Sequence, residues 1–311
     1  MVRFTIGILC AVSVMSCGHP RSLVAPVRLF GPVIGNEIIA GRTDEGTGRP
    51  VLMLVAERDL VSIDVEHRST TRRGLALADA SSCWGLARLS DGSLWTIRDW
   101  KTLREISPAG DTLRELPLGG AQAALFGAGD RLLFQRAEFV APDQALTAAR
   151  PGDDRHEPWS TLQTRPYKLA RTSVAALNLV TCGPTRAEER ACWFPDDPAV
   201  ALIDPSGSTR RLELAGIPHI APEILLTSDN PARPVRDAFV DRSGGVWIIS
   251  AGTPVEGTQP SPGGWLLAHF APAGAPLERL NLSEPARLIL ETDTRHIVLL
   301  MGSGYVAEVR L

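Results

Sequence analysis

The sequence has little excess charge of either sign and lacks the common signatures of nucleophilic enzymes. Its 32 basic and 35 acidic residues leave a formal net charge of −3. No broad cationic surface is therefore available to bind a phosphate backbone, which argues against nucleic acid as a partner. No Gly-x-Ser-x-Gly nucleophile elbow and no phosphate-binding glycine loop occurs, so nucleophilic catalysis has no support in the sequence.

Long hydrophobic runs are also missing after the first residues of the chain. No later apolar stretch reaches the roughly 20 residues that a membrane-spanning helix needs. At the start, Arg3 precedes the apolar run 4–14, whose length is typical of a secretory signal. The run ends in Val14-Met15-Ser16-Cys17, which resembles the lipobox of bacterial lipoproteins.

This resemblance implies that Cys17 becomes the acylated first residue of the mature chain. Residues 1–16 are then a lipoprotein signal peptide, residues 17–22 a lipidated linker and residues 23–311 the folded domain. Gly18 stands where many inner-membrane lipoproteins carry aspartate, which favours anchoring in the outer membrane of the cell envelope. The alternative is an ordinary cleavable leader with an incidental cysteine.

Three of the five cysteines remain in the expected domain. Cys182 and Cys192 flank a polar segment and adjoin apolar residues, in a strand, loop, strand pattern. Because export leads to an oxidising compartment, this pattern predicts a disulfide between them. Two separately buried thiols are the alternative, and metal ligation is disfavoured because no histidine lies nearby in the sequence. Cys83 is expected to be a small buried apolar side chain.

Glycine and proline are abundant, with 28 and 24 residues. Both disfavour long helices, and their even spread favours short strands joined by turns. The segments Leu86–Ile97 and Ala238–Ile249 resemble each other. Each contains a short apolar strand, a polar turn with glycine, and a second strand that carries tryptophan. Gly92 and Gly244 supply the positive φ that a tight hairpin turn requires.

A second repeated marker lies outside these hairpins. The segments 106–110, 203–207 and 270–274 share an apolar residue, a proline and a final glycine, and a strand follows each. With weaker copies, turn markers fall near residues 67, 110, 152, 207 and 274, at spacings of about 42 to 67 residues, which suit one four-stranded blade each. The sequence therefore predicts an all-β propeller of six four-stranded blades, with five or seven blades as alternative counts.

The pattern resembles the six-bladed β-propellers of the NHL, streptogramin-lyase-like and gluconolactonase-like group. The resemblance implies a ring of sheets that are apolar on both faces and are stable only when packed against their neighbours. The last blade ends after three predicted strands. An N-terminal strand around Leu23 to Phe30 is therefore expected to complete it and to close the ring.

Metal and cofactor residues of that group have no evident match in this sequence. Gluconolactonase-like propellers hold a divalent cation in the central channel with Glu, Asn and Asp side chains, and streptogramin lyases use a His and Glu arrangement. The six histidines form no ligand pair. The charged segments 153–157 and 196–197 are interpreted as solvated loops. We therefore expect no cofactor, with Ca²⁺ in the central channel as the alternative.

Propeller geometry indicates where a functional face lies. Residues just before an inner strand and just after a second strand gather at one mouth of the channel. The candidate binding residues at these positions are Trp84, Arg98, Asp99, Trp100, Arg236 and Asp237. Trp and Arg are enriched at recognition hot spots. The alternative interpretation is structural, with Trp84 packed between blades and Arg98 paired with a neighbouring carboxylate.

Three functional hypotheses follow from these observations. The first is a lipid-anchored envelope propeller that binds a protein, peptide or glycan without catalysis and contacts the membrane through its lipid. The second is a propeller hydrolase or lyase with a metal at the channel mouth. The third is a purely structural role within a larger envelope assembly.

Overall fold

The structure is a computed structural model. It describes residues 23–35, 39–44, 51–56, 59–75, 83–136, 145–153, 155–165, 177–183, 189–217, 219–220, 233–251, 264–292 and 296–311. The predicted signal peptide and linker, residues 1–22, lie outside the described residues. In the part of the chain that is described, no helix has the length and apolar character required to cross a membrane.

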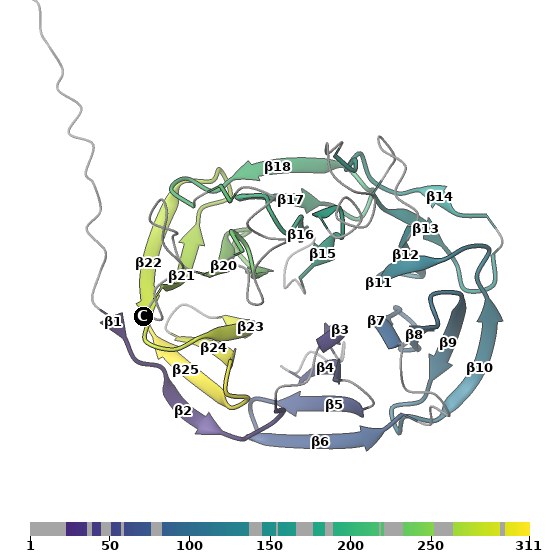
Figure 1. The fold of residues 1–311 in the computed structure, drawn as a ribbon, viewed down its shortest axis with the longest axis horizontal. Helices are drawn as coiled ribbons and strands as arrows, with labels where there is room; N and C mark the ends of the chain where they lie inside the picture. Colours follow the sequence, from purple (N-terminus) through teal and green to yellow (C-terminus); the bar gives the residue numbers. More distant parts are fainter. Residues whose placement is uncertain are drawn as a thin grey trace, which may run out of the picture.

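The described residues form six sheets arranged as blades around a central axis (Figure 1). Within each blade the strands follow one another outward along the chain. Blade 1 contains β3 (Ile39–Asp44), β4 (Val51–Ala56), β5 (Asp59–Asp64) and β6 (Ser69–Gly74). Blade 2 contains β7 (Cys83–Arg88), β8 (Leu94–Arg98), β9 (Thr102–Ile106) and β10 (Thr112–Pro117). Blade 3 contains β11 (Gln122–Ala128), β12 (Arg131–Arg136), β13 (Thr147–Ala149) and β14 (Glu157–Pro158).

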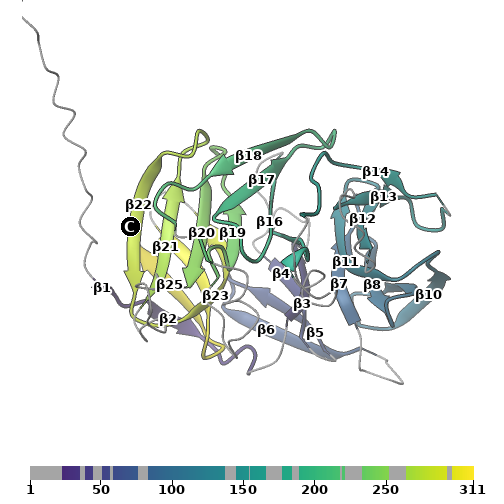
Figure 2. The ribbon, with the colours of Figure 1, turned by 45° about the horizontal axis from the view of Figure 1, so that its top comes forward.

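The second half of the chain forms the other three blades, which Figure 2 shows from a tilted view. Blade 4 contains β15 (Thr181–Cys182), β16 (Arg190–Trp193), β17 (Ala199–Ile203) and β18 (Thr209–Glu213). Blade 5 contains β19 (Asp237–Val240), β20 (Val246–Ala251), β21 (Trp265–Phe270) and β22 (Pro276–Leu282). Blade 6 contains β23 (Ala286–Thr292), β24 (His296–Met301) and β25 (Val306–Arg310). The six-bladed all-β propeller predicted from the sequence repeats is confirmed.

The N-terminal segment closes the ring, as predicted. β2 (Val27–Phe30) pairs antiparallel with β25 and supplies the fourth strand of blade 6. β1 (Leu23–Val24) pairs in parallel with the end of β22 and extends blade 5 to five strands. This extra strand was not predicted from the sequence. The two strands follow the rim from blade 5 to blade 6 (Figure 1), so the start of the chain ties these blades together.

The predicted hairpin turns have the expected geometry. Gly92 has a φ of 87° and Gly244 a φ of 78°, values that favour glycine. In the first turn, the Asp91 Oδ1 atom accepts hydrogen bonds from the Ser93 backbone nitrogen at 2.9 Å and from its hydroxyl group at 2.7 Å. The bonds from Ser93 lower the pKa of the Asp91 carboxyl group. Short polar side chains therefore fix the turn that the glycine permits.

Apolar clusters hold neighbouring blades together. The described residues contain such a cluster at each of the six contacts between adjacent blades. The repeated tryptophans of the second strands, Trp95, Trp193 and Trp247, are 0%, 3% and 3% exposed. Each belongs to the cluster that faces the following blade. The sequence repeat thus corresponds to one packing unit, which recurs around the ring.

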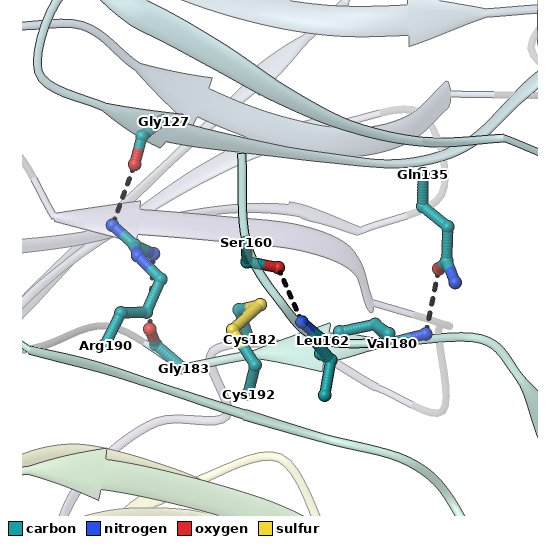
Figure 3. Close-up of a disulfide and its surroundings, with 9 residues drawn as sticks. All are labelled: Gly127, Gln135, Ser160, Leu162, Val180, Cys182, Gly183, Arg190 and Cys192. Carbon is teal, nitrogen blue, oxygen red and sulfur yellow. Dashed lines mark hydrogen bonds between the residues drawn. A yellow bond between two sulfur atoms is a disulfide. The ribbon is translucent and has the colours of Figure 1, made fainter. Parts of the chain in front are cut away.

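The predicted disulfide lies on the inner side of blade 4. Cys182 in β15 and Cys192 in β16 are directly paired across the two strands, and their sulfur atoms are bonded (Figure 3). Arg190 donates hydrogen bonds to the carbonyl oxygens of Gly183 at 3.2 Å and of Gly127 in blade 3 at 2.9 Å. The short strand β15 is therefore held both covalently and by hydrogen bonds.

Candidate functional site at the channel mouth

The chain enters each blade at its inner strand and leaves it at its outer strand. All inner strands therefore begin on one face of the ring, which we call the entry face. The turn between second and third strands also lies on this face. The six candidate residues belong to blade 2 (Trp84, Arg98, Asp99, Trp100) and to blade 5 (Arg236, Asp237). Blades 2 and 5 stand opposite each other in the ring (Figure 1).

In blade 2, the turn between β8 and β9 has an unusual backbone. Asp99 has a φ of 50° and Trp100 a φ of 61°, while the Lys101 backbone nitrogen donates to the Arg98 carbonyl oxygen at 3.2 Å. Positive φ at both central positions is typical of a type I′ hairpin turn, which normally contains Asn-Gly. A tryptophan thus occupies a position that favours glycine, and it is 37% exposed.

Arg98 is bound within its own blade. Its Nε atom lies 3.0 Å from the Asp99 Oδ2 atom, and its Nη1 atom lies 3.6 Å from the Glu115 Oε1 atom. Glu115 also accepts a hydrogen bond from Arg104 at 2.5 Å. This is the pairing with a neighbouring carboxylate that the structural interpretation of Arg98 proposes. The side chain of Trp84 lies outside the described residues, although its backbone pairs with Ile97.

In blade 5, Asp237 forms a buried ion pair with Arg42 of blade 1. The Arg42 Nη1 atom donates to Asp237 Oδ2 at 2.8 Å, and its Nη2 atom donates to Oδ1. The two side chains are 7% and 2% exposed. The backbone nitrogen of Ile289 in blade 6 also donates to Oδ2, at 2.7 Å. Burial raises the pKa of the Asp237 carboxyl group, and the guanidinium of Arg42 opposes this shift.

This ion pair joins three blades near the axis of the ring. A fourth blade approaches it closely, because a Cβ atom added at Gly183 would lie 2.0 Å from the Ala238 carbonyl oxygen and 3.3 Å from Arg42 Nη2. Only glycine fits there without displacing the backbone of blade 5. Asp237 is therefore a buried structural carboxylate that is already satisfied by its partners.

Next to Asp237, Arg236 contributes a cation and an aromatic contact. Its Cζ atom lies 5.0 Å from the centre of the Trp265 ring, within the range of a cation–π interaction. Burial lowers the pKa of the Arg236 guanidinium, and the charges of Arg233 and Arg287 lower it further. Arg233, three residues earlier, is exposed, and Arg287 is the second residue of β23 in blade 6. Blades 5 and 6 thus place three arginines near the entry face.

Sequence reasoning identified Asp237 but missed its partner. Arg42 lies inside the inner strand β3 of blade 1. The available signal was a single charged residue within a strand that faces the centre of a ring. Such a charge is costly to bury without a partner, so it marks a residue that pairs across the channel.

One interpretation of charged residues was wrong. Asp196 and Asp197 are 2% and 3% exposed, whereas a solvated loop was expected. Arg165 pairs with Asp196, and Arg211 donates to both carboxylate oxygens of Asp197 at 2.7 and 2.9 Å. The fold brings the two arginines to the acidic pair from positions at least 14 residues away, so the pairing could not be read from the local run of charge.

The other charged run, residues 153–157, is exposed where it is described. Asp153, Arg155 and Glu157 are exposed, and the ring of His156 stacks on Phe134 at 4.7 Å between centroids. In the described part of the chain, no group of three or more His, Cys, Asp or Glu side chains is placed to hold a metal ion.

Known proteins resemble this chain in fold but not in sequence. No family model and no curated protein matches the chain. A member of the DUF4221 family from Bacteroides vulgatus is 10% identical with a TM-score of 0.54, over 92% of this chain and 95% of that chain. A protein of unknown function from Bacteroides thetaiotaomicron is 9% identical with a TM-score of 0.54, over 93% and 75%. Virginiamycin B lyase from Staphylococcus aureus is 11% identical with a TM-score of 0.48, over 89% and 95%.

Proposed function

We propose that this β-propeller is a non-catalytic binding module for a protein, peptide or glycan of the cell envelope, and that it binds through its entry face. The observation that carries this proposal is the turn that holds Trp100. A large aromatic side chain is exposed at a backbone position where glycine would be the favoured residue. Strained positions of this kind cluster at binding and catalytic sites, where function retains them.

The chemistry of the entry face supports recognition. An exposed tryptophan offers a large rigid contact area that loses little conformational entropy on binding. On the opposite blade, Arg236 stacks over Trp265, and Trp and Arg are the residues most often found at binding hot spots. A ligand that spans the channel mouth would contact both blades.

A substitution that separates stability from binding tests this proposal. We expect Trp100→Gly to leave the melting temperature unchanged or raised, because glycine relieves a backbone conformation that costs about 1 to 2 kcal/mol in other residues. The same variant should lose capture of the envelope partner. Arg68→Gly is a matched control, since Arg68 has a φ of 50° and is exposed on the opposite face, in the turn between β5 and β6.

The assay uses the immobilised mature protein with envelope extract and with a glycan array, each with and without added Ca²⁺. Partner capture by the wild type and Arg68→Gly, but not by Trp100→Gly, supports the proposal. Equal capture by all three proteins would show that binding does not use this face. Binding of Ca²⁺ by the wild type with turnover of a captured glycan or peptide would favour the metal-dependent hydrolase or lyase instead.

We also propose that Cys17 carries a lipid that anchors the propeller in the envelope, with the outer membrane as its site. Five residues, 18–22, lie between Cys17 and Leu23, where β1 begins. Fully extended, the six residue steps from Cys17 to Leu23 span about 22 Å. Because β1 and β2 lie on the rim of blades 5 and 6, this rim would stand close to the membrane surface.

Fractionation of cells tests the anchor. Cys17→Ser should move the protein from the membrane fraction to the soluble fraction and abolish incorporation of labelled palmitate. Cys83→Ser is the matched control, and it should keep both properties. Unchanged membrane partitioning of Cys17→Ser would refute lipidation at this residue.

A further inference from the structure

We propose that the ligand of the Trp100 turn is a glycan, one of whose sugar rings stacks on the indole while its hydroxyl groups bind the ionised side chains beside it. This inference rests on the proposed binding function and selects one of its three ligand classes. Three features of the turn carry it: a fixed backbone, paired charges next to the indole, and carbonyl groups that are already in use.

The backbone around Trp100 is fixed from two blades. Within blade 2, the Leu118 nitrogen donates to the Lys101 carbonyl oxygen at 2.7 Å. From the start of blade 3, the Gln122 nitrogen donates to the Trp100 carbonyl oxygen at 2.8 Å. The indole is 37% exposed. The turn that carries this exposed ring is therefore ordered before a ligand arrives, which lowers the cost of binding.

An indole on such a turn matches one face of a sugar ring. Aromatic faces are electron-rich, and the C–H groups on one side of a pyranose ring carry a partial positive charge. The two flat surfaces therefore attract each other, and their contact also removes apolar area from water. A rigid aromatic side chain loses little conformational entropy in this contact. Trp100 is thus suited to stack on a sugar.

The charges beside the indole compensate one another. The Arg98 Nε atom lies 3.0 Å from the Asp99 Oδ2 atom. The Glu115 Oε1 atom accepts from the Arg104 Nε atom at 2.9 Å. Asp99 and Glu115 are nevertheless 50% and 41% exposed, and an ionised carboxylate offers about four acceptor sites. Hydroxyl groups suit these acids, because they donate hydrogen bonds without adding a charge to a balanced set.

A peptide strand fits this turn less well than a glycan does. Strand addition requires unpaired N–H and C=O groups at the edge of a sheet. The carbonyl oxygens of Arg98, Trp100 and Lys101 already accept from backbone nitrogens of the protein itself. A peptide would therefore have only side chains to contact here. Stacking and hydroxyl binding, by which a glycan is recognised, are both provided by the turn.

Selective degradation of an envelope extract tests this inference. The immobilised protein is exposed to intact extract, to extract digested with proteinase K, and to extract treated with anhydrous trifluoromethanesulfonic acid, which cleaves glycosidic bonds and leaves peptide bonds. Interferometry follows binding, and the sugars in the captured material are quantified after acid hydrolysis. We expect capture to survive proteinase K, to bring sugars with it, and to be lost once the glycosidic bonds are cleaved.

The degradation experiment also separates this inference from the proposed function. Loss of capture after proteinase K would overturn the glycan, and the binding module would stand with a protein or peptide as its ligand. Capture that resists both treatments would overturn the glycan as well, since glycosidic bonds would then be dispensable. No capture of the intact extract would refute the proposed binding function itself, and the glycan with it.

Substitutions in the turn test how the glycan is held. Trp100→Leu keeps apolar area but removes the aromatic face, so binding of the proteinase K digest should weaken at least about tenfold. Trp100→Phe should weaken it less. Asp99→Asn should weaken it about fivefold, because a charged acceptor is replaced by a neutral one. Asparagine tolerates a positive φ, so we expect this variant to fold.

Asp130→Asn is the matched control. Asp130 is 59% exposed, lies in the turn between β11 and β12 on the opposite face, and pairs with Arg150 as Asp99 pairs with Arg98. Its substitution should leave binding unchanged. Circular dichroism melting verifies that each variant is folded. Binding by Trp100→Leu at the wild-type level, or equal weakening by Asp99→Asn and Asp130→Asn, would overturn the assignment of the glycan to this turn.

Discussion

At the scale of single residues, two inner strands place an ion pair in the packed interior of the propeller. Arg42 and Asp237 are almost completely buried and satisfy each other. A buried ion pair contributes little net stability, because desolvation offsets the attraction. Removing one partner is far more damaging, since the other is left as an uncompensated charge. The pair therefore specifies how blades 1, 5 and 6 meet more than it adds to the free energy of unfolding.

We expect Arg42→Met to lower the free energy of unfolding by about 3 to 5 kcal/mol. The double variant Arg42→Met/Asp237→Asn should lose much less, because no charge is left and the side-chain amide oxygen introduced by the second substitution can still accept from the Ile289 nitrogen. Urea unfolding monitored by tryptophan fluorescence measures both. Equal losses in the two variants would mean that the cost comes from packing and not from charge.

His269 gives blade 5 a half-buried polar contact. Its Nε2 atom lies 3.0 Å from the Asp241 Oδ2 atom, and its ring stacks on Trp247 at 4.2 Å with an angle of 5° between the planes. Burial lowers the pKa of His269 below its ordinary value of 6.5, although the Asp241 carboxylate opposes this shift. The folded state therefore binds a proton at His269 less readily than the unfolded state does.

This difference predicts how stability depends on pH. The contribution of His269 is fully present above pH 6.5, and it is lost as pH falls from there through the lower pKa of the folded state. We expect His269→Gln to reduce the decline in unfolding free energy between about pH 7.5 and pH 5, measured by urea titration at each pH. His219→Gln, at an exposed position, should keep the wild-type decline; a decline unaltered in His269→Gln would contradict the assignment.

At the scale of elements, blade 4 has the shortest inner strand among the described blades. β15 comprises only Thr181 and Cys182, and two residues form too few hydrogen bonds to hold a strand in place. The disulfide to β16 supplies a covalent link, and the cysteines themselves are buried in the cluster shared by blades 3 and 4. The link therefore secures the weakest part of the inner ring.

Loss of the disulfide should destabilise the protein measurably. Closing a loop of about 11 residues is worth about 3 kcal/mol in the chain-entropy model. We expect Cys182→Ala/Cys192→Ala to lose about this amount in guanidinium unfolding and to become insensitive to dithiothreitol. Cys83→Ala should retain the response to dithiothreitol. If reductant does not destabilise the wild type, the disulfide is not a stabilising element.

The elements also show what the sequence could and could not predict. The hairpins around Gly92 and Gly244 were predictable because turn chemistry is local, and the cysteines because adjacent antiparallel strands bring them together. The partners of Asp237 and Asp196 were not, because arginines distant in the sequence reach them only after the ring has formed. β1 was also missed, since two residues are too few to give a strand pattern.

At the scale of the whole molecule, stability depends on closure of the ring. Each blade buries its two apolar faces only against its neighbours, so a missing contact exposes two surfaces at once. β2 completes the sheet of blade 6, and its residues Leu29 and Phe30 pack into the cluster between blades 6 and 1. β1 only overlaps the end of blade 5 by two residue pairs.

Two truncations compare these contributions. A chain that begins at Pro26 keeps β2 and should melt within a few degrees of a chain that begins at Cys17. A chain that begins at Gly31 loses β2, and we expect its melting temperature to fall by about 10 °C or more. Differential scanning calorimetry measures both. Similar melting temperatures of the two chains would show that β2 is not required to close the ring.

The pairing of β2 with β25 also orders the assembly of the protein in time. Residues 27–30 leave the ribosome early, yet their partners are residues 306–310. Until residues 306–310 have been synthesised and β25 has formed, β2 has no strand to pair with. Such contacts between distant segments form slowly, and an open strand edge can pair with another molecule. Two newly synthesised chains could therefore exchange their β2 strands, so crowding during synthesis is the stage at which this protein is most exposed to misassembly.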